Sequence, residues 1–172
     1  LFDSWFDKYK GVISLIAIEN GELHKGDIIT VTSSGTNYEI LEIGIMYPEQ
    51  VPTNVLFAGQ VGYIIAGMKT VKEARIGDTI HLKNARVTPY PGFKPARPMV
   101  FAGIFPVENT DYELLADAIE KLTLNDSSLK IEKTHSDALG IGFRCGFLGL
   151  LHMEVFQQRL EQEYQVSVIA TA

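Results

Sequence analysis

Short apolar runs separated by turn residues fill the first half of the chain. Six of these runs are typical of strands, and most of them are rich in Val and Ile. They are LFDSWF, GVISLIAI, DIITVTSS, NYEILEIGIM, QVGYIIAGM and DTIHLK. Turn sequences such as Asn20-Gly21 and Gly77-Asp78 lie between them. No helical pattern interrupts the runs, so we predict that residues 1–88 form an all-β closed barrel.

The next segment, PYPGFKPAR at residues 89–97, contains three prolines and one glycine. Proline fixes the backbone and prevents regular pairing, so this composition is typical of a stiff linker. We therefore expect a boundary between two domains here.

After the linker, the apolar pattern indicates helices as well as strands. Strand-like runs are PMVFAGIFPV, SLKIEK, ALGIGFRCGF and VSVIATA. Apolar residues recur with helical spacing at Tyr112, Leu115, Ile119 and Leu122, and again at Met153, Phe156, Leu160 and Tyr164. The predicted order is strand, helix, strand, strand, helix, strand. This order predicts an α+β ferredoxin-like domain over residues 98–172.

The last strand–helix connection is rich in glycine. Gly142, Gly146 and Gly149 lie where the strand pattern becomes helical, and glycine permits positive φ or close backbone approach there. Leu148, Leu151 and Val155 form a second apolar stripe, so we expect this helix to be covered on two sides. His152 lies between the stripes and is expected to be packed and hydrogen-bonded. We call Gly142, Gly146, Gly149 and His152 the strand–helix corner.

Charge is distributed unevenly along the chain. The net charge is −6, yet no acid lies between Asp78 and Glu108. That span contains four basic residues, which are Lys83, Arg86, Lys94 and Arg97. Basic residues without neighbouring acids are candidates for contact with RNA phosphates. The alternative is that these four pair with the acids between Asp111 and Glu120.

A second candidate for RNA contact lies near the start of the chain. Trp5, Phe6 and Tyr9 are close in sequence to Lys8 and Lys10. Aromatic rings beside basic residues can stack on bases. The same rings can instead close the end of a barrel, and the sequence leaves both interpretations open.

The sequence contains no pattern that predicts catalysis. It lacks the phosphate-binding pattern Gly-x-x-x-x-Gly-Lys-Ser/Thr. Its four histidines lack the spacing of a metal site, and the single cysteine, Cys145, is expected to be buried and inert. We therefore predict no catalytic, cofactor-binding or metal-binding residue in this chain.

Two sets of segments resemble a known family. GFRCGFLGLLHMEVFQQRLEQEY is similar to the third-domain signature of the LepA family of translational GTPases, also called elongation factor four. GVISLIAIENGELHKGDIITV and AGQVGYIIAGMKTVKEARIGDTI resemble the second domain of translational GTPases. The resemblance therefore implies the second and third domains of such a factor, without its GTPase domain.

The resemblance implies that the parent protein is a GTP hydrolase, whereas this fragment alone is not an enzyme. The parent would use GTP and Mg²⁺, with no cofactor in this fragment. It would promote mitochondrial protein synthesis and fidelity by moving tRNAs back on improperly translocated ribosomes. Implied partners are small-subunit RNA and proteins, tRNA-bearing ribosomal complexes, and the GTPase and C-terminal domains of the same chain.

Three further segments, LTLNDSS, VGYIIAGMK and MEVFQQRLEQEY, are more similar to mitochondrial than to bacterial members. The resemblance thus implies a monomer in the mitochondrial matrix, with peripheral association with the inner membrane as one option. The bacterial cytoplasm is the alternative location. The alternative function is a stand-alone regulatory module that binds a protein or a small ligand. An acylphosphatase shares the topology, but Arg144 and Asn125 do not match its phosphate-binding loop.

Overall fold

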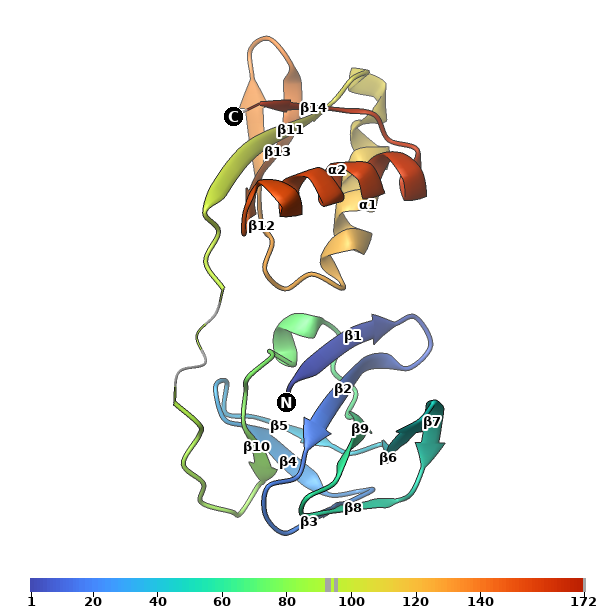
Figure 1. The fold of residues 1–172 in the computed structure, drawn as a ribbon. Coiled ribbons are helices and arrows are strands. Elements are labelled where there is room, and N and C mark those ends of the chain that lie inside the picture. Colours follow the sequence, from blue (N-terminus) through green and yellow to red (C-terminus); the bar gives the residue numbers. More distant parts are fainter. Residues whose placement is uncertain (92–93, 95, 172) are drawn as a thin grey trace. The chain divides into compact units, whose positions relative to one another are not determined.

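The structure is a computed structural model that describes residues 1–91, 94 and 96–171. The chain divides into two compact units, Leu1–Lys94 (unit 1) and Pro95–Ala172 (unit 2). The linker predicted at residues 89–97 includes positions 92, 93 and 95, which lie outside the described residues. Figure 1 shows each unit and its elements.

Unit 1 consists of strands and one short 3-10 helix, η1 (Val71–Glu73). Its described strands are β1 (Asp3–Asp7), β2 (Gly11–Ala17), β3 (Glu22–His24), β4 (Ile28–Val31), β5 (Thr36–Glu39), β6 (Glu42–Tyr47), β7 (Glu49–Pro52), β8 (Val55–Phe57), β9 (Val61–Ile65) and β10 (Ile80–Leu82). Each of the six predicted strands overlaps at least one observed strand. The sequence analysis missed β3, β7 and β8, which are three or four residues long.

The strands of unit 1 pair in three antiparallel sheets. Their orders are β1-β2-β9-β6-β7, β10-β4-β5 and β3-β8. Among the described residues these pairings do not join into one closed ring, so the predicted closure is not observed. One reason lies in NYEILEIGIM, which was predicted as one strand and divides into β5 and β6. At the division, the Ile40 amide donates to the Asp27 carbonyl and the Leu41 amide donates to the Ile65 carbonyl.

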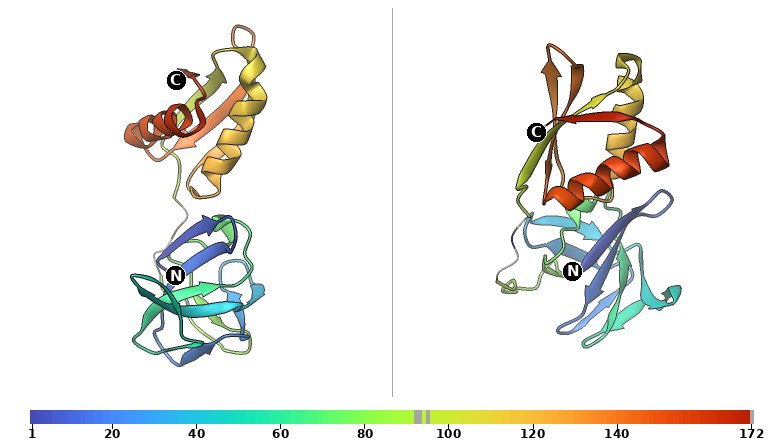
Figure 2. Two further views of the ribbon diagram at one scale, coloured as in Figure 1. Left: turned by 90° about the vertical axis from the view of Figure 1, so that its right-hand side faces the viewer. Right: turned by 45° about the horizontal axis from the view of Figure 1, so that its top comes forward.

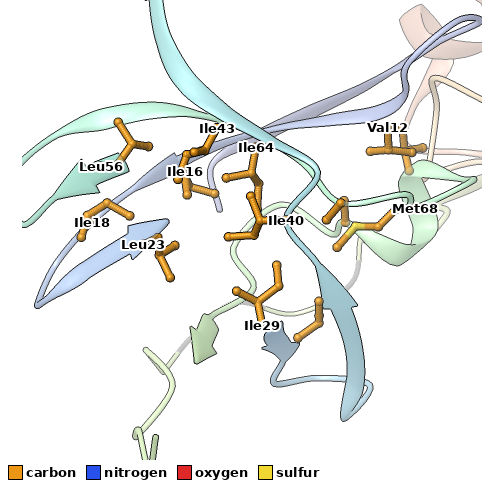
Figure 3. Close-up of a cluster of buried hydrophobic side chains, with 14 residues drawn as sticks. Val12, Ile16, Ile18, Leu23, Ile29, Ile40, Ile43, Leu56, Ile64 and Met68 are labelled. Carbon is orange, nitrogen blue, oxygen red and sulfur yellow. The ribbon is translucent and has the colours of Figure 1, made fainter. Parts of the chain in front are cut away.

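The sheets of unit 1 share one apolar core, shown in Figure 3. Ile29 of β4, Ile43 of β6 and Ile64 of β9 are each no more than 1% exposed. Leu23 of β3 and Leu56 of β8 join the same cluster. Full burial of one such side chain contributes roughly 1.5–3 kcal/mol, so this shared core holds the short sheets together.

Unit 2 is built from one sheet and two α-helices. In chain order its elements are β11 (Val100–Pro106), the 3-10 helix η2 (Asn109–Asp111), α1 (Tyr112–Thr123), β12 (Lys130–Ser136), β13 (Gly140–Phe147), α2 (Leu150–Tyr164) and β14 (Val168–Thr171). All pairs in the sheet are antiparallel, and the strand order is β12-β13-β11-β14. Apart from η2, this is the order of elements that the sequence predicts. Both α-helices lie on the same side of the sheet (Figures 1 and 2).

The core of unit 2 lies between the helices and that side of the sheet. Leu115 and Leu122 of α1 are no more than 1% exposed, as are Cys145 and Phe147 of β13 and Leu160 of α2. The predicted helix faces are therefore the faces that pack. No α-helix in the described part of the chain has both the length and the apolar character needed to cross a membrane.

Only one side of α2 is covered in the described structure. Phe156 and Leu160 are buried, but Leu148, Leu151 and Val155 of the second stripe are 42%, 74% and 44% exposed. The prediction that this helix is covered on two sides is therefore wrong for the described residues. The physical reason is that the sheet and α1 contact one face of the helix only.

Candidate functional site

The strand–helix corner uses glycine for space, not for positive φ. A Cβ on Gly146 would lie 2.8 Å from Cε1 of Phe101 and 2.9 Å from Cβ of Pro98. A Cβ on Gly142 would lie 2.6 Å from the Ile104 carbonyl oxygen. Both glycines therefore stand where a side chain would come too close for ordinary contact, so close approach explains them.

Positive φ, the other role that the sequence allows for these glycines, does not occur at Gly142, Gly146 or Gly149. Gly149 is the N-cap of α2 and has an extended backbone, with φ of −178°, which any residue adopts. A Cβ on Gly149 would meet nothing within 4 Å. The left-handed glycine of this stretch is Gly140, with φ of 77°, at the start of β13. It lies where the chain turns from β12 into β13, because Ser136 pairs directly with Gly140.

His152 fixes the start of α2 to the segment after α1. The Leu148 amide donates to Nδ1 of His152 over 3.1 Å, so the ring proton lies on Nε2. Nε2 in turn lies 2.7 Å from Oδ2 of Asp126. The ring also packs edge-on against Phe147, with centroids 5.5 Å apart. His152 is therefore packed and hydrogen-bonded, as the sequence predicts.

Asp126 is partly buried beside this histidine. Burial acts to raise its pKa, but hydrogen bonds from Ser128 and His152 outweigh burial, and the net effect lowers the pKa of Asp126. The carboxylate therefore stays charged and accepts hydrogen bonds from both neighbours. It acts as a structural anchor for the corner.

A small cavity of about 40 Å³ lies next to this pair, and its lining includes Asp126, His152 and Arg159. This volume holds a few water molecules. Pockets for small-molecule ligands are several times larger. The cavity beside the histidine–aspartate pair is thus smaller than an ordinary small-molecule site.

Cys145 is a buried thiol and not part of a metal-ligand cluster among the described residues. Burial raises the pKa of the Cys145 thiol to about 12, so it is a protonated core residue at neutral pH. In the described part of the chain, no three His, Cys, Asp or Glu side chains gather in an arrangement that could hold a metal ion.

The four basic residues of the predicted RNA contact are all exposed. Lys83 and Arg86 follow β10, where the Ala85 amide closes a turn onto the Leu82 carbonyl. Lys94 ends unit 1, and Arg97 lies in unit 2 before β11. Within the described part of either unit, no ion pair includes any of the four. Their charges are therefore solvated there.

The aromatic residues near the start of the chain separate into two groups. Trp5 and Phe6 of β1 are half-buried against apolar clusters of unit 1, as expected for rings that cover a core. Tyr9 in the following turn is 84% exposed, and Nζ of Lys8 lies 4.8 Å from its ring centroid. Of the three rings, Tyr9 is thus the one that is accessible to a partner.

Sequence reasoning missed one exposed pair in unit 2. The guanidinium carbon of Arg144 on β13 lies 5.1 Å from the ring centroid of Phe101 on β11. Alternation along β13 could have predicted the direction of Arg144. Phe143, Cys145 and Phe147 face the core, so Arg144 must face away from it. The pairing with Phe101 depends on strand register, which the sequence did not give.

Comparisons with known proteins agree with this architecture. The family model "Elongation factor Tu domain 2" matches residues 11–81, which lie in unit 1. Proteins described as "Translation factor GUF1 homolog, mitochondrial" match the whole chain. Those of Sorghum bicolor and Oryza sativa subsp. indica are 60% and 58% identical over 171 residues, or 99% of this chain. That of Trichoplax adhaerens is 58% identical over 172 residues.

The chain belongs to the GUF1 (LepA) family of translation factors. It covers 26% of the length of each of these three relatives. A crystal structure of a Thermus thermophilus protein matches 98% of the chain and 24% of its own, with a TM-score of 0.63 at 21% identity. That likeness supports the fold alone.

Proposed function

We propose that this chain is the ribosome-binding middle part of a mitochondrial translational GTPase. The single observation that carries the proposal is the identity of 55–60% with proteins named mitochondrial GUF1 homologs, over nearly the whole chain. The parent protein then hydrolyses GTP with Mg²⁺ in a domain outside this chain. It supports mitochondrial protein synthesis and fidelity by moving tRNAs back on improperly translocated ribosomes.

The proposal includes a domain plan. Residues 1–88 form a barrel of the translation-factor second-domain type, and residues 89–97 form the linker. Residues 98–172 form a ferredoxin-like domain, supported by the element order and the strand order β12-β13-β11-β14. The chain contacts small-subunit RNA and proteins of the ribosome, and the protein works as a monomer in the mitochondrial matrix.

The basic residues are the proposed contact with ribosomal RNA. Lys83, Arg86, Lys94 and Arg97 are exposed, and no described ion pair neutralises them. Each lysine or arginine that neutralises a phosphate releases condensed counterions, and this favours binding in a salt-dependent way. The four residues lie in and beside the proposed linker, Lys83, Arg86 and Lys94 in unit 1 and Arg97 in unit 2.

Co-sedimentation with mitochondrial ribosomes tests the proposal. The 172-residue chain is expected to pellet with ribosomes through a sucrose cushion at low salt, and to remain in the supernatant without them. Raised salt is expected to release it, because phosphate contacts weaken with salt. If the chain stays in the supernatant at saturating ribosome concentration, it is not a ribosome-binding segment, and the stand-alone regulatory module becomes the better explanation.

A further inference from the structure

One side of the unit 2 sheet carries no helix. Figure 2 shows α1 and α2 together on the other side. Strand alternation and register place a set of side chains and glycines on the helix-free side, which we call the open face. It includes Phe101, Gly103, Phe105, Lys130, Gly142, Arg144 and Gly146. The buried Phe105 ring lies against Gly103 and Gly142.

Phe101 is the exposed ring of the open face. It is 44% exposed although it belongs to β11, a central strand of the sheet. Its direct partner on β13 is Gly146, which has no side chain to cover the ring. A Cβ on Gly146 would lie 2.8 Å from the ring, so any other residue there would displace it. The glycine therefore leaves the ring accessible.

Positive charge flanks this ring. Arg144 is exposed, and its guanidinium lies over one face of the Phe101 ring with its carbon 5.1 Å from the ring centroid, so on that side a base would stack on the guanidinium plane or displace it. Lys130 of β12 pairs with the other side of Gly146, so Lys130, Gly146 and Phe101 form one row across three strands. Glu132 of β12 is the one acid paired with this part of β13, where it lies opposite Arg144. No described ion pair joins Glu132 to Arg144.

We propose that the open face binds unpaired RNA, with one base stacked on Phe101 and the neighbouring phosphates held by Arg144 and Lys130. Aromatic rings on the central strands of a four-stranded sheet are one way in which proteins bind single-stranded RNA. Stacking suits any base, and arginine beside the ring adds both a planar contact and a charge. An acidic peptide would use the two cations but would have no use for the ring.

This inference rests on the proposed function, because it names a further RNA contact of a ribosome-binding chain. The open face is a different surface from the one proposed for the four basic residues. Of those four, Arg97 is near it in sequence, four residues before Phe101. It can be tested without ribosomes, so the two ideas can fail separately.

The test measures binding of fluorescein-labelled octauridine to the 172-residue chain by fluorescence anisotropy at low salt. Phe101→Leu removes the ring while keeping an apolar side chain, and it is expected to weaken binding on the order of tenfold. Phe101→Trp keeps a stacking ring and is expected to retain affinity. The matched control is Phe57→Leu in β8, since Phe57 is also exposed, at 49%. Thermal melting confirms that each variant is folded.

Three results would overturn the inference. These are no binding of octauridine by the unaltered chain, equal binding by folded Phe101→Leu, or an equal loss with Phe57→Leu. If Phe101→Leu lowers ribosome co-sedimentation but leaves octauridine affinity unchanged, the open face meets a ribosomal protein, and the RNA assignment is wrong. If octauridine binding depends on Phe101 but the chain does not co-sediment with ribosomes, RNA binding by the open face is supported and the proposed function is wrong.

Discussion

At the scale of single residues, the absence of a side chain at Gly146 lets Phe101 and Pro98 pack beside it and leaves the Phe101 ring accessible. Phe101 and Pro98 occupy the space that a Cβ on Gly146 would need. Gly146→Val is therefore expected to lower the free energy of unfolding of unit 2 by roughly 1–3 kcal/mol, through forced displacement of these rings. Chemical denaturation followed by circular dichroism measures the change.

The matched control for that substitution is Gly149→Ala. Gly149 has an extended backbone and open space around its Cα, so alanine fits without strain. Alanine is less favoured than glycine at an N-cap, so we expect a loss below about 1 kcal/mol, smaller than that of Gly146→Val. Equal losses in the two variants would show that the corner needs glycine for a reason other than the rings beside Gly146.

The Asp126–His152 pair gives a prediction about pH. The pKa of Asp126 lies below its ordinary value of 3.8 in the folded chain, so the unfolded chain binds more protons near that pH. The pair's contribution is therefore fully present above about pH 5 and is lost as pH falls through the folded pKa. Asp126→Asn is expected to cost about 1 kcal/mol at pH 7 and progressively less below about pH 4, as measured by urea denaturation at each pH.

A second aspartate–histidine pair provides the control for this measurement. Nε2 of His135 lies 3.8 Å from Oδ1 of Asp137, but both side chains are exposed. Because solvated ion pairs contribute little, Asp137→Asn is expected to leave the denaturation midpoint unchanged at any pH. A pH-independent loss with Asp126→Asn would mean that its charge is not what stabilises the corner.

At the scale of elements, α2 separates a packed face from an exposed one. Phe156 is 4% exposed and Leu151 is 74% exposed. Phe156→Ala is expected to destabilise unit 2 by about 3–5 kcal/mol through the cavity it leaves. Leu151→Ala is expected to change stability by less than about 0.5 kcal/mol. Comparable losses in thermal or urea unfolding would show that the second stripe is covered in solution.

The same helix shows how far the sequence could predict the elements. Helical spacing located α1 and α2 and their buried residues correctly, because tertiary packing selects the apolar stripe. Spacing alone could not show that the stripe of Leu148, Leu151 and Val155 stays uncovered here. That depends on which neighbours exist, and the described sheet and α1 contact one face only.

Strand prediction in unit 1 reached its limit for a similar reason. Val-rich and Ile-rich runs located the longer strands, but β3 and β8 are three residues each and carry little pattern. The division at Ile40 and Leu41 depends on hydrogen bonds to Asp27 and Ile65, which are distant in sequence. Such long-range contacts also decide which strands pair and whether a sheet closes.

At the scale of the whole molecule, motif resemblance indicates the function, and no site geometry does. His152 and Cys145 are structural residues, and the described residues contain no cluster of metal ligands. The Phe101–Arg144 pair could not be predicted, because it requires the register of β11 against β13. The central claim is therefore about binding: exposed basic residues contact ribosomal RNA.

Salt dependence of ribosome affinity tests that claim most directly. Changing Lys83, Arg86, Lys94 and Arg97 to Gln in the 172-residue chain is expected to flatten the slope of log affinity against log salt by about 3 units, at about 0.7–0.9 per phosphate.

The control changes four exposed lysines elsewhere, which are Lys25, Lys69, Lys72 and Lys133. Because this removes the same net charge away from the proposed contact, the account predicts a much smaller change in slope for the control. If the two fourfold variants have the same slope, or if the first keeps the slope of the unaltered chain, these basic residues do not contact ribosomal RNA and the account is contradicted.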